Sequence, residues 1–196
     1  MERKKGKATK ERVVQTASEL FKEKGYVNVT ISDICEASGI TKSTFYYHFK
    51  SKDAILEEYF TFPSAYVEAN FNHLLISSDY VGQLWIFLMS AFWPAKDSEV
   101  ELSRQLMISR LQTALPAGLD NTWETERLLI QKAQEAGQIQ NTAPSAQVLE
   151  CLLDAIAGAR FFWCMKGGNY DIQSRFREIF RTILMINPEH GFLRSV

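Results

Sequence analysis

The stretch TISDICEASGITKSTFYYHF, residues 30–49, contains the end signals of two short helices and the turn between them. Thr30 and Asp33 have the spacing of a helix capping pair, so the first helix is expected to begin there. Gly39 supplies the left-handed residue that commonly ends a helix. Thr41 can cap a second helix two residues later. Two short helices joined by a tight turn that contains glycine form a helix-turn-helix.

The second helix has an apolar side and a polar side. Phe45 and Phe49 are four residues apart and should point together into a core. The other positions present hydroxyl, basic and aromatic groups without an acid, and with the cap they are Thr41, Lys42, Ser43, Thr44, Tyr46, Tyr47 and His48. Such a face suits the major groove, where hydroxyls bond base edges or phosphates. The alternative is an ordinary three-helix core with a polar outer side.

A third helix is expected to begin after Ser51, which can cap it. This position places Lys52 in the first turn, beside the positive end of the helix dipole. Anions bind at such helix ends, so Lys52 is a candidate phosphate ligand.

Residues 30–56 closely resemble the N-terminal domain of the TetR/AcrR family of transcriptional regulators. The resemblance rests on residues at fixed spacing, namely Thr30, Ile34, Ala37, Gly39, Phe45-Tyr46-Tyr47-His48-Phe49, Ser51, Lys52 and Leu56. Ser38 stands where alanine is common, a departure that we expect to matter little. The resemblance implies an all-α fold, with an N-terminal three-helix helix-turn-helix domain followed by a helical domain for ligand binding and dimerisation.

The same resemblance implies a homodimer that binds a palindromic operator in double-stranded DNA and releases it when a small molecule binds. It implies that Thr30, Tyr47 and Lys52 hold phosphates. It also implies that Lys42, Ser43 and Thr44 contact base edges.

Charge is distributed unevenly along the 196 residues. Residues 1–54 contain 11 Lys or Arg and 7 Asp or Glu, whereas residues 55–196 contain 11 and 16. A basic head on an acidic body confines the attraction for DNA to the head. The basic arm at residues 3–10 is either a DNA contact or a disordered tail. We expect a DNA-binding domain at 1–56 and a ligand-binding and dimerisation domain at 57–196.

Helix breakers divide the rest of the chain into expected helices at 80–93, 97–114, 122–136, 144–166 and 171–186. The last two, Pro144–Lys166 and Asp171–Ile186, are apolar on more than one side. They therefore favour a four-helix interface in a homodimer, with Ala159 and Ile179 on the outward stripe. The alternative is that both sides are the core of a monomer.

Large aromatic and methionine side chains in the body favour a cavity for a largely apolar effector. We assign to it Trp85, Met89, Phe92, Met107, Trp123 and Phe161, each of which has core packing as its alternative. Arg110 and Arg160 could orient an acidic ligand or form salt bridges. A bound effector is expected to displace the helix that starts at Ser51, with Pro63 as the bend, and so change the spacing of the two recognition helices.

The sequence predicts no enzyme, because it lacks a Gly-rich phosphate loop, a nucleophile elbow and a Cys/His cluster with metal spacing. It predicts no cofactor or metal. Cys35, Cys151 and Cys164 are expected to be reduced and buried, with redox sensing as the alternative. We find no signal peptide and no apolar run of about 20 residues, so a cytoplasmic protein without membrane contact is expected. The competing functional hypotheses are a helical adaptor that binds protein through the same head, and a dimeric enzyme acting on a small molecule.

Overall fold

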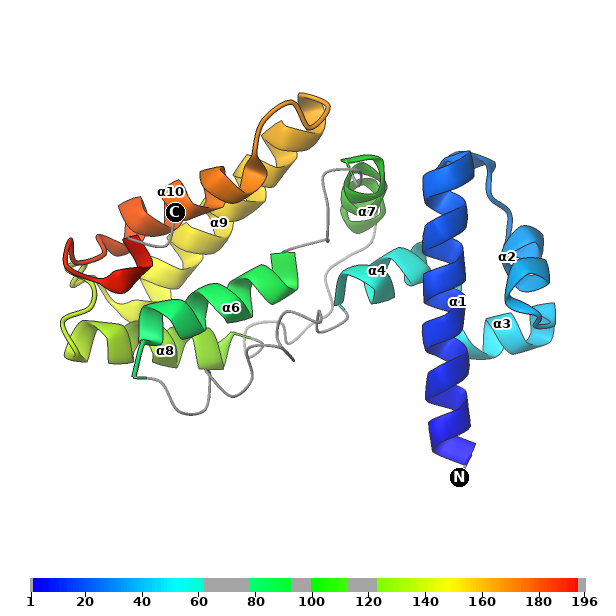
Figure 1. The fold of residues 1–196 in the computed structure, drawn as a ribbon, viewed down its shortest axis with the longest axis horizontal. Helices are drawn as coiled ribbons and strands as arrows, with labels where there is room; N and C mark the ends of the chain where they lie inside the picture. The colour runs from blue at the N-terminus through cyan, green and yellow to red at the C-terminus, as the bar shows by residue number, and fades with distance from the viewer. Residues whose placement is uncertain (1, 62–77, 93–99, 113–122, 194–196) are drawn as a thin grey trace. The chain divides into compact units, whose positions relative to one another are not determined.

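A computed structural model describes residues 2–61, 78–92, 100–112 and 123–193, and the regular elements in these ranges are helices (Figure 1). The predicted all-α fold is therefore confirmed. The chain forms two compact units, of which unit 1 contains residues 1–62 and 94–114 and unit 2 contains residues 63–93 and 115–196. None of the described helices combines the length and the apolar character that a membrane crossing requires.

Unit 1 contains the helix-turn-helix. Its elements are α1 (Glu2–Lys24), the 3-10 turn η1 (Tyr26–Asn28), α2 (Ile31–Ser38), α3 (Lys42–His48), α4 (Asp53–Thr61) and α7 (Val100–Gln112). α1 begins at Glu2 and so includes the basic arm at residues 3–10. The basic arm is thus helical in this structure, which argues against the disordered tail.

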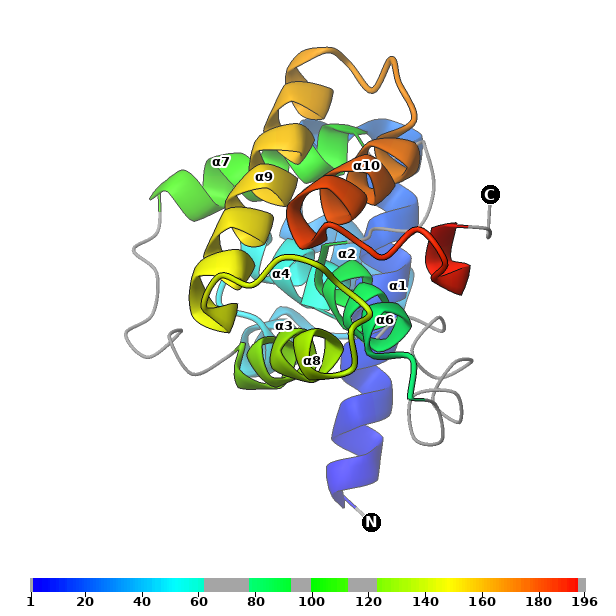
Figure 2. The ribbon, with the colours of Figure 1, turned by 90° about the vertical axis from the view of Figure 1, so that its left-hand side faces the viewer.

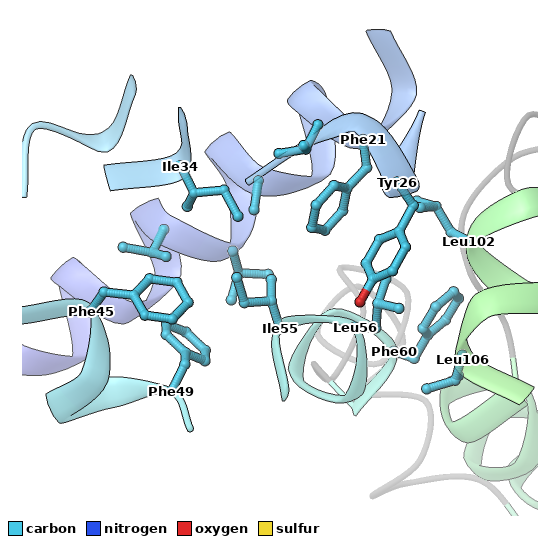
Figure 3. Close-up of a cluster of buried hydrophobic side chains, with 14 of the residues drawn as sticks. Phe21, Tyr26, Ile34, Phe45, Phe49, Ile55, Leu56, Phe60, Leu102 and Leu106 are labelled. Atoms are coloured by element: carbon cyan, nitrogen blue, oxygen red, sulfur yellow. The ribbon is translucent and has the colours of Figure 1, made fainter. Parts of the chain in front are cut away.

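A single apolar core holds unit 1 together (Figure 3). Phe45, Ile34 and Ile55 are fully buried in it, and α1 contributes Val13 and Ala17. The buried positions of α1 fall on one side of that helix, at the spacing of an amphipathic helix. This core fixes α3 with its remaining side chains directed outward.

The helix α7 belongs to unit 1, although its sequence position suggested the second domain. Leu102 and Leu106 lie in the head core beside Tyr26 and Phe60 (Figure 3). The compact unit therefore does not end at residue 56, because a segment distant in sequence completes its core. Arg110 on α7 donates to the Glu57 carboxylate on α4, with Nε–Oε1 at 3.0 Å and Nη2–Oε2 at 2.9 Å. Arg110 was expected either to orient an acidic ligand or to form a salt bridge, and the structure shows the salt bridge.

Unit 2 consists of α6 (Tyr80–Phe92), α8 (Glu124–Glu135), α9 (Ser145–Met165), α10 (Ile172–Leu184) and the 3-10 turn η3 (Gly191–Leu193). α6 lies along α8, and α9 packs against α10 (Figures 1 and 2). The side-chain amide oxygen of Gln138, Oε1, accepts from the backbone N–H of Tyr80 and of Val81, which ties the start of α6 to the end of α8. The two helices therefore run antiparallel.

The predicted helix ends in unit 2 agree with the structure to within a few residues. Gly137, with φ of 67°, follows α8, and the Asp171 carboxylate caps α10 by accepting from the N–H of Gln173. The expected kink at Pro63 lies outside the described residues.

Two expectations about exposure in unit 2 are wrong. Ala159 and Ile179 were placed on an outward stripe, but each is only 8% exposed because α9 and α10 pack on these sides. The apolar side chains that α9 does expose are Phe161, Phe162 and Met165. Cys151 is exposed rather than buried, whereas Cys35 and Cys164 are buried as expected. Helical periodicity shows which residues share a side but not which side a neighbouring helix covers.

Candidate nucleic-acid interface

α2 begins with a complete capping box. The Thr30 hydroxyl accepts from the backbone N–H of Asp33 at 3.2 Å, and an Asp33 carboxylate oxygen accepts from the backbone N–H of Thr30 at 2.7 Å. The hydroxyl of Thr30 also donates to this carboxylate, and these bonds hold the pKa of Asp33 below its usual value. The predicted helix start is confirmed, and Thr30 lies exposed at the positive end of α2.

The turn and the start of α3 also follow their local signals. Gly39 has φ of 63°, the left-handed conformation that glycine adopts without strain. The Thr41 hydroxyl accepts from the backbone N–H of Thr44 at 3.1 Å, and the two threonine hydroxyls lie 3.0 Å apart. These bonds anchor the first turn of α3 and orient two of the predicted contact residues.

The outer side of α3 is polar and aromatic, as the sequence predicted. Lys42, Ser43, Tyr46 and Tyr47 are exposed, and the Tyr47 side chain is 84% exposed. Tyrosine is enriched at interfaces because its ring offers an apolar surface and its hydroxyl a hydrogen bond. α3 carries no acidic residue, so nothing on this helix repels a phosphate backbone.

His48 is less available for a DNA contact than the sequence suggested. Its side chain is half-buried, and its ring lies close to Gly6 of α1. A methyl group added at Gly6 would be in van der Waals contact with the His48 Cε1 atom, at 3.9 Å. The basic first turns of α1 therefore lie beside the end of α3. Lys10 forms an ion pair of 2.6 Å with Glu58 and lies over the Phe49 ring. Lys10 thus links α1 to α4 and to the core side of α3.

Lys52 is placed differently from a freely extended phosphate ligand. Its Nζ donates to the backbone carbonyls of Tyr26 at 2.7 Å and Val29 at 2.8 Å, and it lies 4.1 Å from the centre of the Tyr26 ring. Burial lowers the pKa of Lys52, while the charge of Asp53 opposes that shift. Because an ammonium group has three donors, one remains after these two bonds. The bond to Val29 brings Lys52 next to Thr30, the other predicted phosphate ligand.

Tyr26 and Asp53 are positioning residues that the sequence reasoning missed. The Tyr26 hydroxyl donates to the Asp53 carboxylate, and burial together with this bond raises the pKa of Tyr26. Lys52 and Asp53 thus connect the start of α4 to the loop before α2. The pairing joins residues 27 positions apart, so no local pattern signals it.

The predicted effector residues are only partly brought together. Trp85 and Met89 are buried on α6, and Trp123 is half-buried at the start of α8. Phe161 is 44% exposed on α9, and Met107 lies on α7 in unit 1 rather than in unit 2. Phe92 ends α6, and its side chain lies outside the described residues.

Trp85 packs against side chains that the sequence reasoning did not select. Its ring meets Phe180 edge-on at 5.2 Å and Phe192 at 5.4 Å, and the Arg177 guanidinium lies 5.2 Å from its centre. This part of Trp85 is therefore covered by α10 and by η3. Phe192 lies close to the end of the chain and follows no helical pattern that would have marked it.

Residues 13–59 match the family described as "Bacterial regulatory proteins, tetR family". The HTH-type transcriptional regulator YerO of Bacillus subtilis is 49% identical over 47 residues, and IcaR of Staphylococcus aureus, a negative regulator of a biofilm operon, is 43% identical over 49 residues. These matches span 24% and 25% of this chain but only 16% of YerO and 26% of IcaR. They concern the head alone.

The whole chain has the fold of solved TetR-family structures. Thermus thermophilus FadR, a repressor solved with lauroyl-CoA, superposes with a TM-score of 0.63 over 92% of this chain and 97% of that one. The sequences are only 19% identical, so this likeness shows the fold and leaves the ligand of this chain undetermined.

Proposed function

We propose that this chain, a member of the TetR family of bacterial regulatory proteins by its head sequence and its fold, is a ligand-responsive repressor that binds a palindromic operator. The outer side of α3 supports this proposal most directly. Its exposed side chains are Lys42, Ser43, Tyr46 and Tyr47, and the helix contains no acidic residue. The core beneath α3 holds that helix in one orientation, as base reading requires. The proposal includes no catalytic activity.

DNA binding is tested by fluorescence anisotropy with random and selected duplexes at several salt concentrations. The purified chain should bind duplex DNA with an affinity that falls steeply as salt rises, because Lys and Arg contacts release counterions. Replacing Ser43 or Thr44 by alanine should change the preferred operator. Each good base contact that is lost should reduce the discrimination between base pairs by about 1–3 kcal/mol of binding free energy. An adaptor that uses its head to bind protein would show no salt-dependent DNA binding.

Lys52→Ala is expected to weaken binding to all duplexes alike and to lower the salt slope by about 1, because a phosphate contact is lost. It should also lower the thermal stability of unit 1, since the bonds to the carbonyls of Tyr26 and Val29 disappear. Lys132→Ala, an exposed lysine of unit 2, removes the same charge and is the control. A change in sequence preference with an unaltered salt slope would contradict the phosphate role.

The proposed effector is a small, largely apolar molecule held among α6, α8 and α9 of unit 2. Trp85 and Met89 belong to α6, Phe161 belongs to α9, and Trp123 is the N-cap residue of α8. Met107 is not included, because it lies in unit 1. FadR of T. thermophilus was solved with lauroyl-CoA, which supports a ligand in a TetR fold but not its identity here.

The proposed homodimer uses α9 and α10, the segments Pro144–Lys166 and Asp171–Ile186. Phe161, Phe162 and Met165 are exposed on α9. Three neighbouring large apolar side chains at the surface favour a protein interface, because a monomer gains by covering them. A dimer would also present two copies of α3 to the two halves of a palindrome.

A further inference from the structure

A buried carboxylate stands among the apolar residues of α8. The buried residues of this helix are Glu126, Leu129, Ile130 and Ala133, spaced three and four apart along one side. Glu126 is the first of them and is only 7% exposed. Glu126 lies in the first turn of α8, where the helix dipole favours an acid, but a first-turn acid normally faces water rather than the apolar side of its helix.

One oxygen of the Glu126 carboxylate lacks the partner that normally accompanies a buried acid. Its Oε2 atom is buried and has no hydrogen-bond partner among the described residues. Burial raises the pKa of Glu126, and its own backbone N–H is the group that opposes this shift. A charge or polar group buried without a partner is unfavourable, so proteins seldom keep one without a functional reason.

Among the described residues, the helices packed against α8 give the Glu126 Oε2 atom no cationic hydrogen-bond partner. α6 contains no charged residue between Tyr80 and Phe92, and its titratable group is the Tyr80 phenol. On α9, Glu150 and Asp154 are exposed, and buried Arg160 is engaged in an interaction of its own. On α8 itself, the neighbouring Arg127 is bonded to Glu124.

The surroundings of Glu126 are those of the proposed effector site. Because α6 and α8 are antiparallel and joined at Gln138, the first turn of α8 lies beside the last turns of α6. Met89 is on those turns, and Trp123 precedes Glu126 by one helical turn. An apolar ligand held there would lie near the Glu126 carboxyl group.

We propose that Glu126 recognises a protonated amine on the effector, so that the effector is an apolar organic cation. This inference rests on the proposed function, since it names the ligand class of the same site. An ammonium donor would form a charge-assisted hydrogen bond with the Oε2 atom. A carboxylic acid would instead bring a second negative charge, and an alcohol would form only a neutral donor's weaker bond.

The test compares three probes of similar size, namely 2-(1-naphthyl)ethylamine, 2-(1-naphthyl)ethanol and 1-naphthylacetate, by isothermal titration at pH 8. The wild-type protein should bind the amine about tenfold to a hundredfold more tightly than the alcohol. Glu126→Gln should reduce that ratio to near one, because the amide carries no charge. Glu135→Gln, which neutralises an exposed acid on the same helix, is the control and should keep the ratio.

A second measurement uses only the wild-type chain, so it holds even where Glu126→Gln fails to fold. Amine affinity should rise between pH 5 and pH 8 as the Glu126 carboxyl loses its proton, while alcohol affinity should not. Equal affinity for amine and alcohol, an amine preference kept by Glu126→Gln, or no amine binding below about 1 mM would each overturn the inference. Salt-dependent DNA binding is measured separately and tests the proposed regulator. A failure of amine recognition can therefore be told apart from a failure of the DNA-binding proposal.

Discussion

Phe45→Ala is expected to unfold unit 1 and abolish DNA binding. Phe45 is fully buried, and its ring lies 5.6 Å from that of Phe49. Truncating a buried phenylalanine costs about 3–5 kcal/mol, because the lost transfer energy adds to the cavity left behind. A small domain is stable by only about 5–15 kcal/mol, so this loss consumes a large share of its stability.

Circular dichroism and thermal unfolding measure this effect, with Tyr47→Ala as the matched aromatic variant on the same helix. Tyr47 is 84% exposed, so its truncation should leave the unfolding temperature nearly unchanged. Tyr47→Ala should nevertheless weaken DNA binding, because the exposed ring belongs to the proposed interface. Equal losses of stability in the two variants would contradict the assignment of Phe45 to the core side of α3 and of Tyr47 to its outer side.

Phe162→Glu is expected to convert the proposed dimer to monomers and to weaken operator binding by about 10²–10⁴-fold. Phe162 is 56% exposed on α9 in the single chain, so a charge there costs little in a monomer. In a dimer the same charge would be buried in an apolar interface without a partner, which is strongly unfavourable. The loss of affinity follows because two linked heads bind two half-sites far more tightly than one head binds either.

Sedimentation at micromolar concentration and operator titration measure these two effects together. Leu111→Glu adds the same charge at a position on α7 that is 83% exposed and should leave the assembly unchanged. The Phe162→Glu chain should also keep its helical circular dichroism. A wild-type chain that sediments as a monomer, or a variant that still dimerises, would refute the α9 and α10 interface.

The helix-turn-helix could be read from the sequence because its signals are local. Thr30 with Asp33, Gly39 and Thr41 each act within four residues, and each takes the predicted role. The inward direction of Phe45 and Phe49 follows from helical spacing in the same way. The ends of the later helices were also predicted closely, since glycine and proline act on the backbone next to them.

The errors concern contacts between segments that are far apart in the chain. Lys52 was expected in the first turn of its helix, but it immediately precedes α4, and its Nζ folds back onto the carbonyls of Tyr26 and Val29. Ala159 and Ile179 share the predicted helix sides, but those sides are covered. Each of these outcomes depends on a neighbour whose identity no local spacing contains.

The sequence by itself determined the helices, the turn and the polar outer side of α3, because hydrogen bonds within a few residues and the 3.6-residue period fix them. Only the tertiary structure decided that Leu102 and Leu106 complete the head core and that the Glu126 Oε2 atom is buried without a hydrogen-bond partner among the described residues. The physical reason is that burial depends on which distant helix covers a side chain. A chain encodes that choice in the sum of many weak packing contacts, which no single stretch of sequence displays.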